Sequence, residues 1–345
     1  MYLFDMDPGT LEELFASWGE PAFRARQLWQ AVYVDLIHGY DEISTFSKNL
    51  RTRLNESVAF SHLKAIDRQS SEDQETVKTL FSLPDGNMIE AVLMHYDVRD
   101  TLCISSQSGC AMGCVFCATG QMGFMRNLTA GEITEQVVHY ARELKVQGKR
   151  VTNVVVMGMG EPFHNYDAVM AAIDRLNDAQ GMNLGARRFT ISTVGLVPMI
   201  QRFAAEKRQV NLAISLHAAN DALRASMMPV DRKYPIADLI AAARNYTEQT
   251  GRRITFEWAL IRDVNDREED ALELAELVKG MLCHVNVIPL NPTRKYAGQA
   301  TTHERALAFK SALESKGIPC TIRLRRGIDI QAGCGQLATR AAEKN

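Results

Sequence analysis

Three cysteines lie close together in the segment Cys110-Ala-Met-Gly-Cys114-Val-Phe-Cys117, which follows a CxxxCxxC pattern. Thiolate sulfur suits iron, and three thiolates on one short loop can hold an iron–sulfur cluster that leaves its fourth iron open. An open iron can bind a substrate or a cofactor. The alternative is a zinc site, which normally has four protein ligands, often as two CxxC pairs. No such pairs occur here, and the nearest further thiol, Cys103, lies seven residues upstream on a predicted strand.

The chain has seven cysteines, and an odd number without a recognisable signal sequence favours a reducing, cytoplasmic setting. Cys283 and Cys320 stand at the starts of predicted strands beside apolar residues, so we expect both to pack in the core. Cys334 lies between Gly333 and Gly335, beyond the last predicted strand. That position suits a mobile loop with a reactive thiol, and core packing is the alternative.

Composition places the chain among folded proteins. With 345 residues, 46% hydrophobic and 23% charged, it is not disordered, collagen-like or a disulfide scaffold, and its length predicts one large domain with an appendage. No apolar run reaches eighteen residues, so we expect no membrane span. The formal net charge of −2 gives no general attraction to polyanions. Any nucleic acid must therefore be bound by a local basic surface.

The elements that must position these residues fall into three regions. From Pro8 to about Leu54, apolar residues recur at threes and fours, which predicts a small helical module. Residues 76–83 and 87–95 alternate around the turn sequence Pro84-Asp85-Gly86, which predicts a β-hairpin. From Thr101 onward, strands alternate with amphipathic helices, which is typical of βαβ units and a parallel sheet, open or curled into a barrel.

The expected elements of this third region are strands near 101–105, 152–157, 188–193, 210–215, 254–261, 284–289 and 319–324, with helices near 129–145, 166–178, 236–249, 267–279 and 303–316. Polar or flexible residues follow several of the strands. In strand order they are Gly160 with Glu161, Ser192, Ser215 with Leu216 and His217, and Asn291. Because the carboxyl ends of parallel strands meet at one edge, we expect most of the chemistry at that mouth. Taken alone, His217 would more often be a structural residue.

The CxxxCxxC loop after the first strand of a βα repeat resembles the radical S-adenosylmethionine (SAM) enzymes. In that superfamily the open iron chelates SAM, and an aromatic residue commonly precedes the third cysteine, as Phe116 does here. Further segments resemble the RlmN/Cfr family of RNA adenine methyltransferases, over essentially the whole chain. They are CISSQSGC at 103–110, GFMRNLT at 123–129, MGMGEP at 157–162, ISLHA at 214–218 and AGCGQL at 332–337.

This resemblance implies an α/β fold, namely a radical-SAM partial (β/α)6 barrel with an N-terminal helical accessory domain and a β-hairpin extension. We accordingly expect the helical accessory domain, a candidate for RNA binding, at residues 1–55 and the hairpin extension at 56–97. The barrel is expected at 98–325, and a C-terminal tail with a methyl-carrying cysteine at 326–345.

The resemblance also implies cofactors and roles. A [4Fe-4S] cluster would be held by Cys110, Cys114 and Cys117, with exchangeable SAM at the open iron and two SAM molecules used per turnover. One SAM would methylate Cys334, and the second would yield a 5′-deoxyadenosyl radical that takes a hydrogen from that methyl, so that the methylene adds to adenine. Cys103 would then form a disulfide with Cys334 and release the RNA. Ordinary methyl transfer fails here because adenine C2 and C8 are not nucleophilic.

Two further sets of residues follow from the family's motifs. Glu90 matches the position proposed for the base that takes a proton from the substituted carbon. Its apolar neighbours favour partial burial and a raised pKa, and a solvent-facing glutamate is the alternative. Glu161 would accept from the ammonium group of SAM. The positions that match SAM-binding residues are Phe116, Gly160, Glu161, Ser192, Ser215, Leu216, His217 and Asn291.

Basic residues occur in local groups. We expect Arg325 and Arg326, eight or nine residues before Cys334, to clamp RNA phosphates. We expect most of the others to be solvated faces. They include Arg24 and Arg26, Lys145, Lys149 and Arg150, Arg187 and Arg188, Arg252 and Arg253, Arg294 and Lys295, and Arg323.

We therefore expect an RlmN-type RNA methyltransferase acting at adenine C2 of 23S rRNA, and also at a tRNA adenosine beside the anticodon. The alternative within the family is Cfr-type methylation at C8, because residues 326–334 depart from the usual RlmN tail. Two other classes are a radical-SAM protein acting on a peptide or small molecule and a non-catalytic zinc-binding RNA module. We also expect an electron donor such as flavodoxin or ferredoxin, a monomer and a cytoplasmic location.

Overall fold

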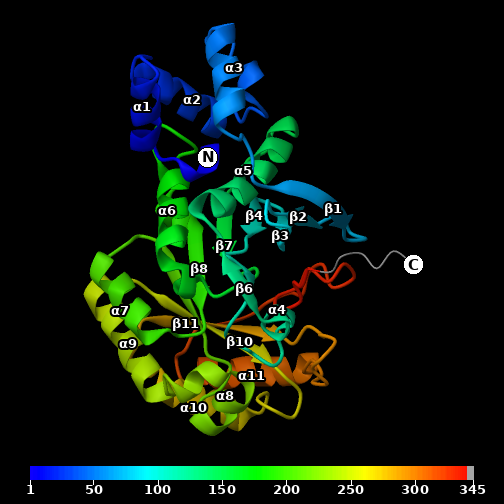
Figure 1. Ribbon diagram of the computed structural model, residues 1–345. Coiled ribbons are helices and arrows are strands. Elements are labelled where there is room, and N and C mark those ends of the chain that lie inside the picture. The colour runs from blue at the N-terminus through cyan, green and yellow to red at the C-terminus, as the bar shows by residue number, and fades with distance from the viewer. Residues whose placement is uncertain (340–345) are drawn as a thin grey trace.

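The computed structural model describes residues 1–339. A small helical module lies at one end of the molecule, and a single large sheet with helices along its outer side forms the rest (Figure 1). None of the helices within residues 1–339 combines the length and apolarity that crossing a lipid bilayer requires.

The N-terminal module consists of α1 (Pro8–Ser17), α2 (Phe23–Tyr33) and α3 (Lys48–Ser57), with short 3-10 turns at Leu3–Asp5 and Tyr40–Glu42. Side-chain caps begin two of these helices, because Asp7 and Ser47 accept hydrogen bonds from the amides three residues later. The apolar faces pack into a cluster that is distinct from the core of the barrel and includes Phe4, Phe15, Leu28, Val32 and Leu54. The predicted helical module is confirmed.

Ten strands form one sheet in the order β1-β2-β3-β4-β7-β8-β9-β10-β11-β12. The pairs from β1 to β4 are antiparallel, and all pairs from β4 to β12 are parallel. A separate small sheet pairs β5 with β6. The bounds are β1 (Lys64–Ser70), β2 (Thr76–Ser82), β3 (Met88–Tyr96), β4 (Arg99–Cys103), β5 (Gln107–Gly109), β6 (Phe124–Asn127), β7 (Asn153–Val156), β8 (Phe189–Thr193), β9 (Asn211–Ser215), β10 (Ile254–Leu260), β11 (Cys283–Pro289) and β12 (Cys320–Ile322).

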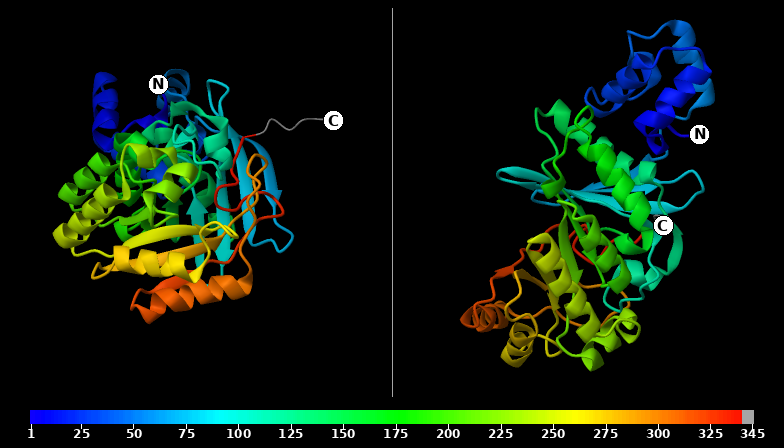
Figure 2. Two further views of the ribbon diagram at one scale, coloured as in Figure 1. Left: turned by 90° about the horizontal axis from the view of Figure 1, so that it is seen from below. Right: turned by 90° about the vertical axis from the view of Figure 1, so that its left-hand side faces the viewer.

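Each parallel strand from β4 to β11 is followed by a long helix, which gives six strand–helix units and confirms the expected (β/α)6 arrangement. These helices run along the outside of the curved sheet (Figure 2). β12 adds a seventh parallel strand, and within residues 1–339 it pairs with β11 alone. The helices are α5 (Ala130–Val146), α6 (Tyr166–Asn177), α7 (Val197–Glu206), α9 (Ile236–Thr250), α10 (Glu268–Leu277) and α11 (His303–Ser315), with shorter α4 (Ala118–Met122) and α8 (Asp221–Met227).

The predicted hairpin is confirmed as β2 and β3, but the structure adds β1 as a third antiparallel strand. The sequence gives no sign of β1, because six of its seven residues are exposed and apolar residues do not alternate along it. α7 is also an addition, although Pro198 at its start and the buried spacing of Ile200, Phe203 and Ala204 are helix signals.

Strand alternation decides which side chains reach the interior of the curved sheet. Outward residues such as Ile191 and Ile214 are fully buried. Many of the side chains on the opposite, inward face are polar, and the register places Glu257 of β10 opposite Asn286 of β11 there. A closed TIM barrel fills this space with layers of branched apolar residues. Here the inward side chains leave a polar interior, formed by Thr190, Ser192, Ser215, Glu257, His284 and Asn286.

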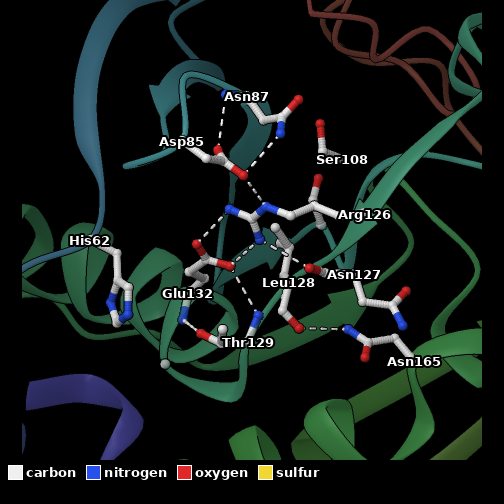
Figure 3. Close-up of polar contacts among 12 residues, drawn as sticks. His62, Asp85, Asn87, Ser108, Arg126, Asn127, Leu128, Thr129, Glu132 and Asn165 are labelled. Atoms are coloured by element: carbon white, nitrogen blue, oxygen red, sulfur yellow. Dashed lines mark hydrogen bonds and ion pairs between the residues drawn. The ribbon is translucent and has the colours of Figure 1, made fainter. Parts of the chain in front are cut away.

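Arg126 on β6 attaches the hairpin to the barrel (Figure 3). Its guanidinium forms ion pairs with Asp85 in the hairpin turn and with Glu132 in the first turn of α5. Glu132 also completes a capping box with Thr129 at the start of that helix. The hairpin that carries Glu90 is therefore held against the segment that follows the cysteine loop.

His62 holds the helical module to the barrel. Its Nε2 lies 2.8 Å from Oδ2 of Asp5, its Nδ1 lies 3.3 Å from Oε2 of Glu135 on α5, and its ring stacks on Tyr2. Burial alone would lower the pKa of His62, but the hydrogen bonds and charges of the two carboxylates outweigh it and raise the pKa to about 9. His62 is therefore charged at neutral pH.

We predict that His62→Gln lowers the free energy of unfolding by an amount that depends on pH. The unfolded histidine titrates near 6.5, so the contribution of the raised pKa is fully present below about pH 6.5 and is lost as the pH rises through 9. Its size is on the order of 3 kcal/mol. Denaturant unfolding of both proteins from about pH 6 to about pH 10 checks this.

The exposed His38 provides the control, because His38→Gln removes an imidazole that faces solvent. The difference between wild type and His62→Gln should shrink with rising pH, and that of the control should stay near zero. A difference that does not change with pH would contradict the charged clamp.

Candidate active site

The CxxxCxxC loop lies between β5 and α4, at the carboxyl end of the parallel strands. Backbone bonds hold it from both sides, because Cys110 donates its amide to the carbonyl of Gly123 and Val115 donates to that of Met227. Burial raises the pKa of the Cys110 thiol to about 12 and that of Cys114 well above its ordinary value. A metal that binds here must therefore displace protons from these thiols.

A cavity lies between this loop and the carboxyl ends of β7 to β11, and we call it the cofactor cavity. Eleven of the residues singled out from the sequence line it, namely Cys110, Cys114, Cys117, Phe116, Gly160, Glu161, Ser192, Ser215, His217, Asn291 and Cys334. Met157, Met228 and Glu257 line it as well. Of these three, Met157 begins the motif at 157–162, and Glu257 is a charged residue within the apolar strand Ile254–Leu260.

Leu216 differs from the other expected SAM-binding residues. Its side chain belongs to the buried core and does not line the cofactor cavity. Its amide donates to the carbonyl of Glu257, and its carbonyl accepts from Arg224. Through these two backbone hydrogen bonds, Leu216 fixes the end of β9 to Glu257 of β10 and to Arg224.

Glu161 is held rigidly in the wall of the cofactor cavity. Its carboxylate accepts hydrogen bonds from the amides of Phe163 and Val194 and from the hydroxyl of Thr193, at 2.7–3.0 Å. Burial nevertheless raises its pKa to about 7, against the lowering effect of these bonds. A cationic group bound in the cavity would favour the ionised carboxylate.

His217 and Phe116 form one wall of the same cavity, with ring centroids 5.0 Å apart in an edge-to-face arrangement. Nδ1 of His217 accepts from the amide of Ala259 at 2.9 Å, which leaves the ring proton on Nε2. Burial, with a smaller effect from Arg224, lowers the pKa of His217 to about 3. His217 is thus a neutral residue that joins β9 to β10, and its ring remains available as a cavity wall.

Arg224 is a positioning residue that the sequence does not reveal. It is fully buried and forms an ion pair with Asp231 at 2.7 Å. Its guanidinium also donates to the carbonyls of Val194 and Leu216, which follow β8 and β9. Because a buried arginine is tolerated only when its donors are satisfied, these bonds fix the two strand ends that carry cavity residues.

Two observations fit the cluster and SAM. Oδ1 of Asn291 is buried in the cavity wall without a hydrogen-bond partner among the described residues, so it can accept from a ligand. The three thiols are the donor set that iron–sulfur clusters use. Within residues 1–339 no group of three His, Cys, Asp or Glu side chains is arranged to hold a metal ion. In a cubane cluster each thiolate binds a different iron, so convergence on one ion is not required.

Cys334 stands between the cofactor cavity and a second cleft, which we call the thiol cleft. It lines both, while Cys103 lines only the thiol cleft. Burial, and secondarily the nearby Cys334, raise the pKa of the Cys103 thiol. Both are free thiols. The fold therefore brings together two cysteines that lie 231 positions apart in the sequence.

Three hydrogen bonds to backbone carbonyls help to hold the tail that carries Cys334. The carbonyl of Gly335 accepts from the amide of Ala118 at 2.7 Å, and the carbonyl of Cys334 accepts from Asn291 at 3.1 Å. The hydroxyl of Thr119 donates to the carbonyl of Leu337 at 2.6 Å. These contacts tie the tail to the helix after the cysteine loop and to the loop after β11. Residues 340–345 of the predicted tail lie outside the described residues.

Comparison with known proteins agrees with this geometry. Residues 104–275 match the family model of the radical SAM superfamily, and residues 1–59 match that of the ribosomal RNA large subunit methyltransferase N-terminal domain. A probable dual-specificity RNA methyltransferase RlmN from Chloroflexus aurantiacus is 50% identical over 98% of this chain and 93% of its own length. The dual-specificity RNA methyltransferase RlmN 1 from Myxococcus xanthus is 48% identical over 97% of this chain and 93% of its own length.

A solved structure of a radical SAM methyltransferase is also similar to this chain. The crystal structure of a radical SAM methyltransferase from Sphaerobacter thermophilus has a TM-score of 0.96 and 51% identity, and the match covers 98% of this chain and 99% of that one. This chain belongs to the RlmN family of radical-SAM RNA methyltransferases.

Glu90, the expected base of this RlmN-family chain, lies buried on β3 rather than facing solvent. Its Oε1 is 3.1 Å from Nζ of Lys78, and its Oε2 accepts from the amide of Ala338 in the tail at 3.0 Å. The register pairs Val92 with Cys103, so Glu90, two residues away, lies on the same face of the sheet as Cys103.

Arg325 and Arg326 both line the thiol cleft beside Cys334, as expected for a clamp. Arg326 is already engaged, because it forms an ion pair with Glu75 and lies over the ring of Tyr96 at 4.4 Å. Arg325 is exposed.

Cys283 and Cys320 belong to the buried core, which confirms their expected packing role.

We predict that Gly160→Ala disrupts the cofactor cavity of this RlmN-family enzyme. Gly160 has φ of +103°, and an added Cβ would lie 2.6–2.8 Å from Gln107, whose side chain accepts from the amide of Glu161. The expected loss of stability is about 1–3 kcal/mol, together with weaker SAM binding. Thermal unfolding and equilibrium dialysis with SAM measure both.

Gly185→Ala is the matched control, because Gly185 has φ of −54° and nothing within 4 Å of its added Cβ. It should change neither stability nor SAM binding. Equal behaviour of the two variants would contradict the steric argument.

Proposed function

We propose that this enzyme methylates C2 of an adenine in 23S rRNA, and also of a tRNA adenosine beside the anticodon, through a methyl group carried on Cys334. The observation that carries this proposal is the position of Cys334, which lines both the cofactor cavity and the thiol cleft that contains Cys103. A thiol so placed can receive a methyl group on one side and be attacked at sulfur on the other. The dual-specificity names of the relatives support two kinds of RNA substrate.

The cofactors would be bound by residues of the cofactor cavity. Cys110, Cys114 and Cys117 would hold a [4Fe-4S] cluster, and Glu161 and Asn291 would bind polar groups of SAM. When bound, the cluster and two SAM molecules per turnover supply a methyl group for Cys334 and the radical that activates it. His217 and Phe116 would exclude water beside the SAM site.

Release of the product is the task we assign to Cys103. After the methylene has joined adenine, the Cys103 thiolate attacks the sulfur of Cys334, and a disulfide forms as the sulfur–carbon bond breaks. The electron pair of that bond stays on the carbon, which takes a proton and becomes the methyl group. Nearby Cys334 is one cause of the raised Cys103 pKa, and it carries no thiolate charge once it is a thioether. Alkylation of Cys334 therefore favours the attacking thiolate.

Glu90 is proposed as the base that removes the proton from the substituted carbon. Its contacts with Lys78 and with the amide of Ala338 keep the carboxylate oriented. The amide contact belongs to the tail, so displacement of the tail by RNA would remove this hydrogen bond from the carboxylate. Proton removal by Glu90 would then depend on movement of the tail.

Several finer properties belong to the same proposal. A disulfide that forms in every turnover must be reduced again, which suits a cytoplasmic location. The cluster needs one-electron reduction, for which flavodoxin or ferredoxin is the expected donor. We expect the enzyme to act as a monomer. We favour C2 over the Cfr-type C8 alternative because the curated relatives of about 50% identity carry the RlmN name.

We predict that Cys103→Ala accumulates a covalent enzyme–RNA adduct, because the methylene can form but the sulfur–carbon bond cannot be broken. Cys334→Ala should transfer no label from methyl-labelled SAM to RNA. Denaturing gel electrophoresis with labelled RNA detects the adduct. Cys283→Ser is the control, because Cys283 packs in the core away from both cavities, and it should release product normally. Recovery of free Cys103→Ala enzyme after turnover would contradict the assignment.

We predict that the added methyl group lies on C2 of adenine. Mass-spectrometric mapping of nucleosides from rRNA and tRNA, in a strain that lacks and then regains this chain, measures its position. Restoration of 2-methyladenosine is the expected result. Restoration of 8-methyladenosine alone would favour the Cfr-type reaction instead.

A further inference from the structure

We propose that RNA phosphates bind along a line of basic clefts at the amino ends of the barrel strands, which leads from the helical module to Cys334. The inference rests on the proposed function, because it takes RNA as the substrate. It adds a binding path that approaches Cys334 from outside the cofactor cavity and is built largely from residues that the sequence alone assigns to solvated faces.

The first part of the path is the junction cleft, between residues 33–36 of the helical module and the loops before β7 and β8. Its basic residues include Lys149, Arg150 and Arg188, all exposed, and Arg99 at the start of β4. None of these four side chains forms a salt bridge with a residue of the described chain. The cleft therefore collects positive charge that no part of residues 1–339 neutralises.

The second part is the barrel cleft, at the amino ends of the strands inside the curved sheet. Arg99 lines this cleft as well as the junction cleft, so the two meet at one side chain. Arg253 and His284 lie further along it. Arg323 lines both the barrel cleft and the thiol cleft, where Cys334 lies. Shared residues thus connect the three clefts in sequence.

Nearly all the charged residues along this path are basic. Among the residues within 1–339 that line the junction, barrel and thiol clefts, the single acid is Glu257, whose pKa is raised by burial. The nearby charges of Arg253 and Arg323 help to lower the pKa of His284, after burial. A group of cations that repel one another in this way is stabilised by a bound polyanion. The net charge of −2 conceals this local excess.

The shape of the path favours an extended nucleic acid strand over an acidic protein. Thr190, Asn211 and Asn286 line the barrel cleft from the inner side of the strands. A single strand with exposed phosphates can enter such a concave space, whereas a folded protein surface cannot. The path also ends at Arg323 beside Cys334, where the target adenine must arrive.

The helical module lines one wall of the junction cleft and adds little positive charge to it. Arg24 is occupied by Gln27, by the carbonyl of Thr45 and by Glu20, and Arg53 lies over the ring of Trp18. Tyr33, Val34 and Leu36 line the junction cleft. The charge clamp at His62 would therefore set the width of the RNA path by fixing the module.

The test compares two double variants of equal charge change. Lys149→Gln with Arg150→Gln removes two charges from the junction cleft. Arg232→Gln with Lys233→Gln removes two exposed charges that line none of the three clefts. A third variant, Arg99→Gln with Arg253→Gln, tests the barrel cleft. The measured quantity is the Kd for an RNA stem-loop containing the target adenosine, over a series of salt concentrations.

Each lost phosphate contact should reduce the slope of log Kd against log salt by about 0.7 for single strands or about 0.9 for duplex RNA. Both cleft variants should therefore reduce the slope by roughly 1.5 and weaken binding about tenfold at low salt. The Arg232/Lys233 control should retain the wild-type slope. SAM cleavage without RNA, with dithionite as reductant, should be the same in all four proteins.

An unchanged slope in the cleft variants would overturn the inference, and so would an equal loss in the control. Normal RNA binding combined with impaired reduction by an acidic flavodoxin would assign the clefts to the electron donor instead. Failure of the proposed function has a different signature, namely that wild-type enzyme transfers no labelled methyl to any RNA.

Discussion

The attachment of the C-terminal tail beside the cysteine loop is the constraint on which the rest of the site depends. The carbonyls of Cys334, Gly335 and Leu337 accept hydrogen bonds from two parts of the barrel, namely the start of α4 and Asn291 after β11. Each such bond contributes on the order of 1 kcal/mol net, so the tail is held in place and is still able to move. A thiol that must serve two clefts in turn needs this intermediate strength of attachment.

The polar interior of the open barrel is the second requirement. Residues that point outward from the strands are mostly apolar and form the core beneath the helices. Because the outward residues form the core, inward positions such as Ser192, Ser215 and Glu257 are available for binding. It also allows basic residues at the amino ends of the strands to form a path into the same interior.

Much of this site could be predicted from the sequence, because its motifs are local. The three cluster cysteines lie on one loop, and Glu161, Ser192 and His217 lie at or just after the ends of strands whose apolar patterns are plain. A match to a family motif does not tell a backbone role from a side-chain role, and Leu216, which the resemblance places at the cofactor, has a side chain that packs in the core. β1 is not predicted from the sequence, because an exposed edge strand carries no alternating apolar pattern.

Contacts between distant segments could not be predicted in the same way. Arg224 pairs with Asp231 and binds the ends of two strands, and nothing in its local sequence marks it as buried. Lys149 and Arg188 look like ordinary solvated charges until the fold places them around one cleft. The sequence motifs identify the reacting groups, and the tertiary contacts decide which of them share a cavity.

The central claim is that Cys334 is held where it can receive a methyl group before RNA arrives. It is tested most directly by incubating the cluster-reconstituted enzyme anaerobically with methyl-labelled SAM and reductant, without RNA, and mapping the label by peptide mass spectrometry. The account predicts one labelled methyl group on Cys334 and none on Cys103. A label that is absent from Cys334, or that appears on Cys103 instead, would contradict it.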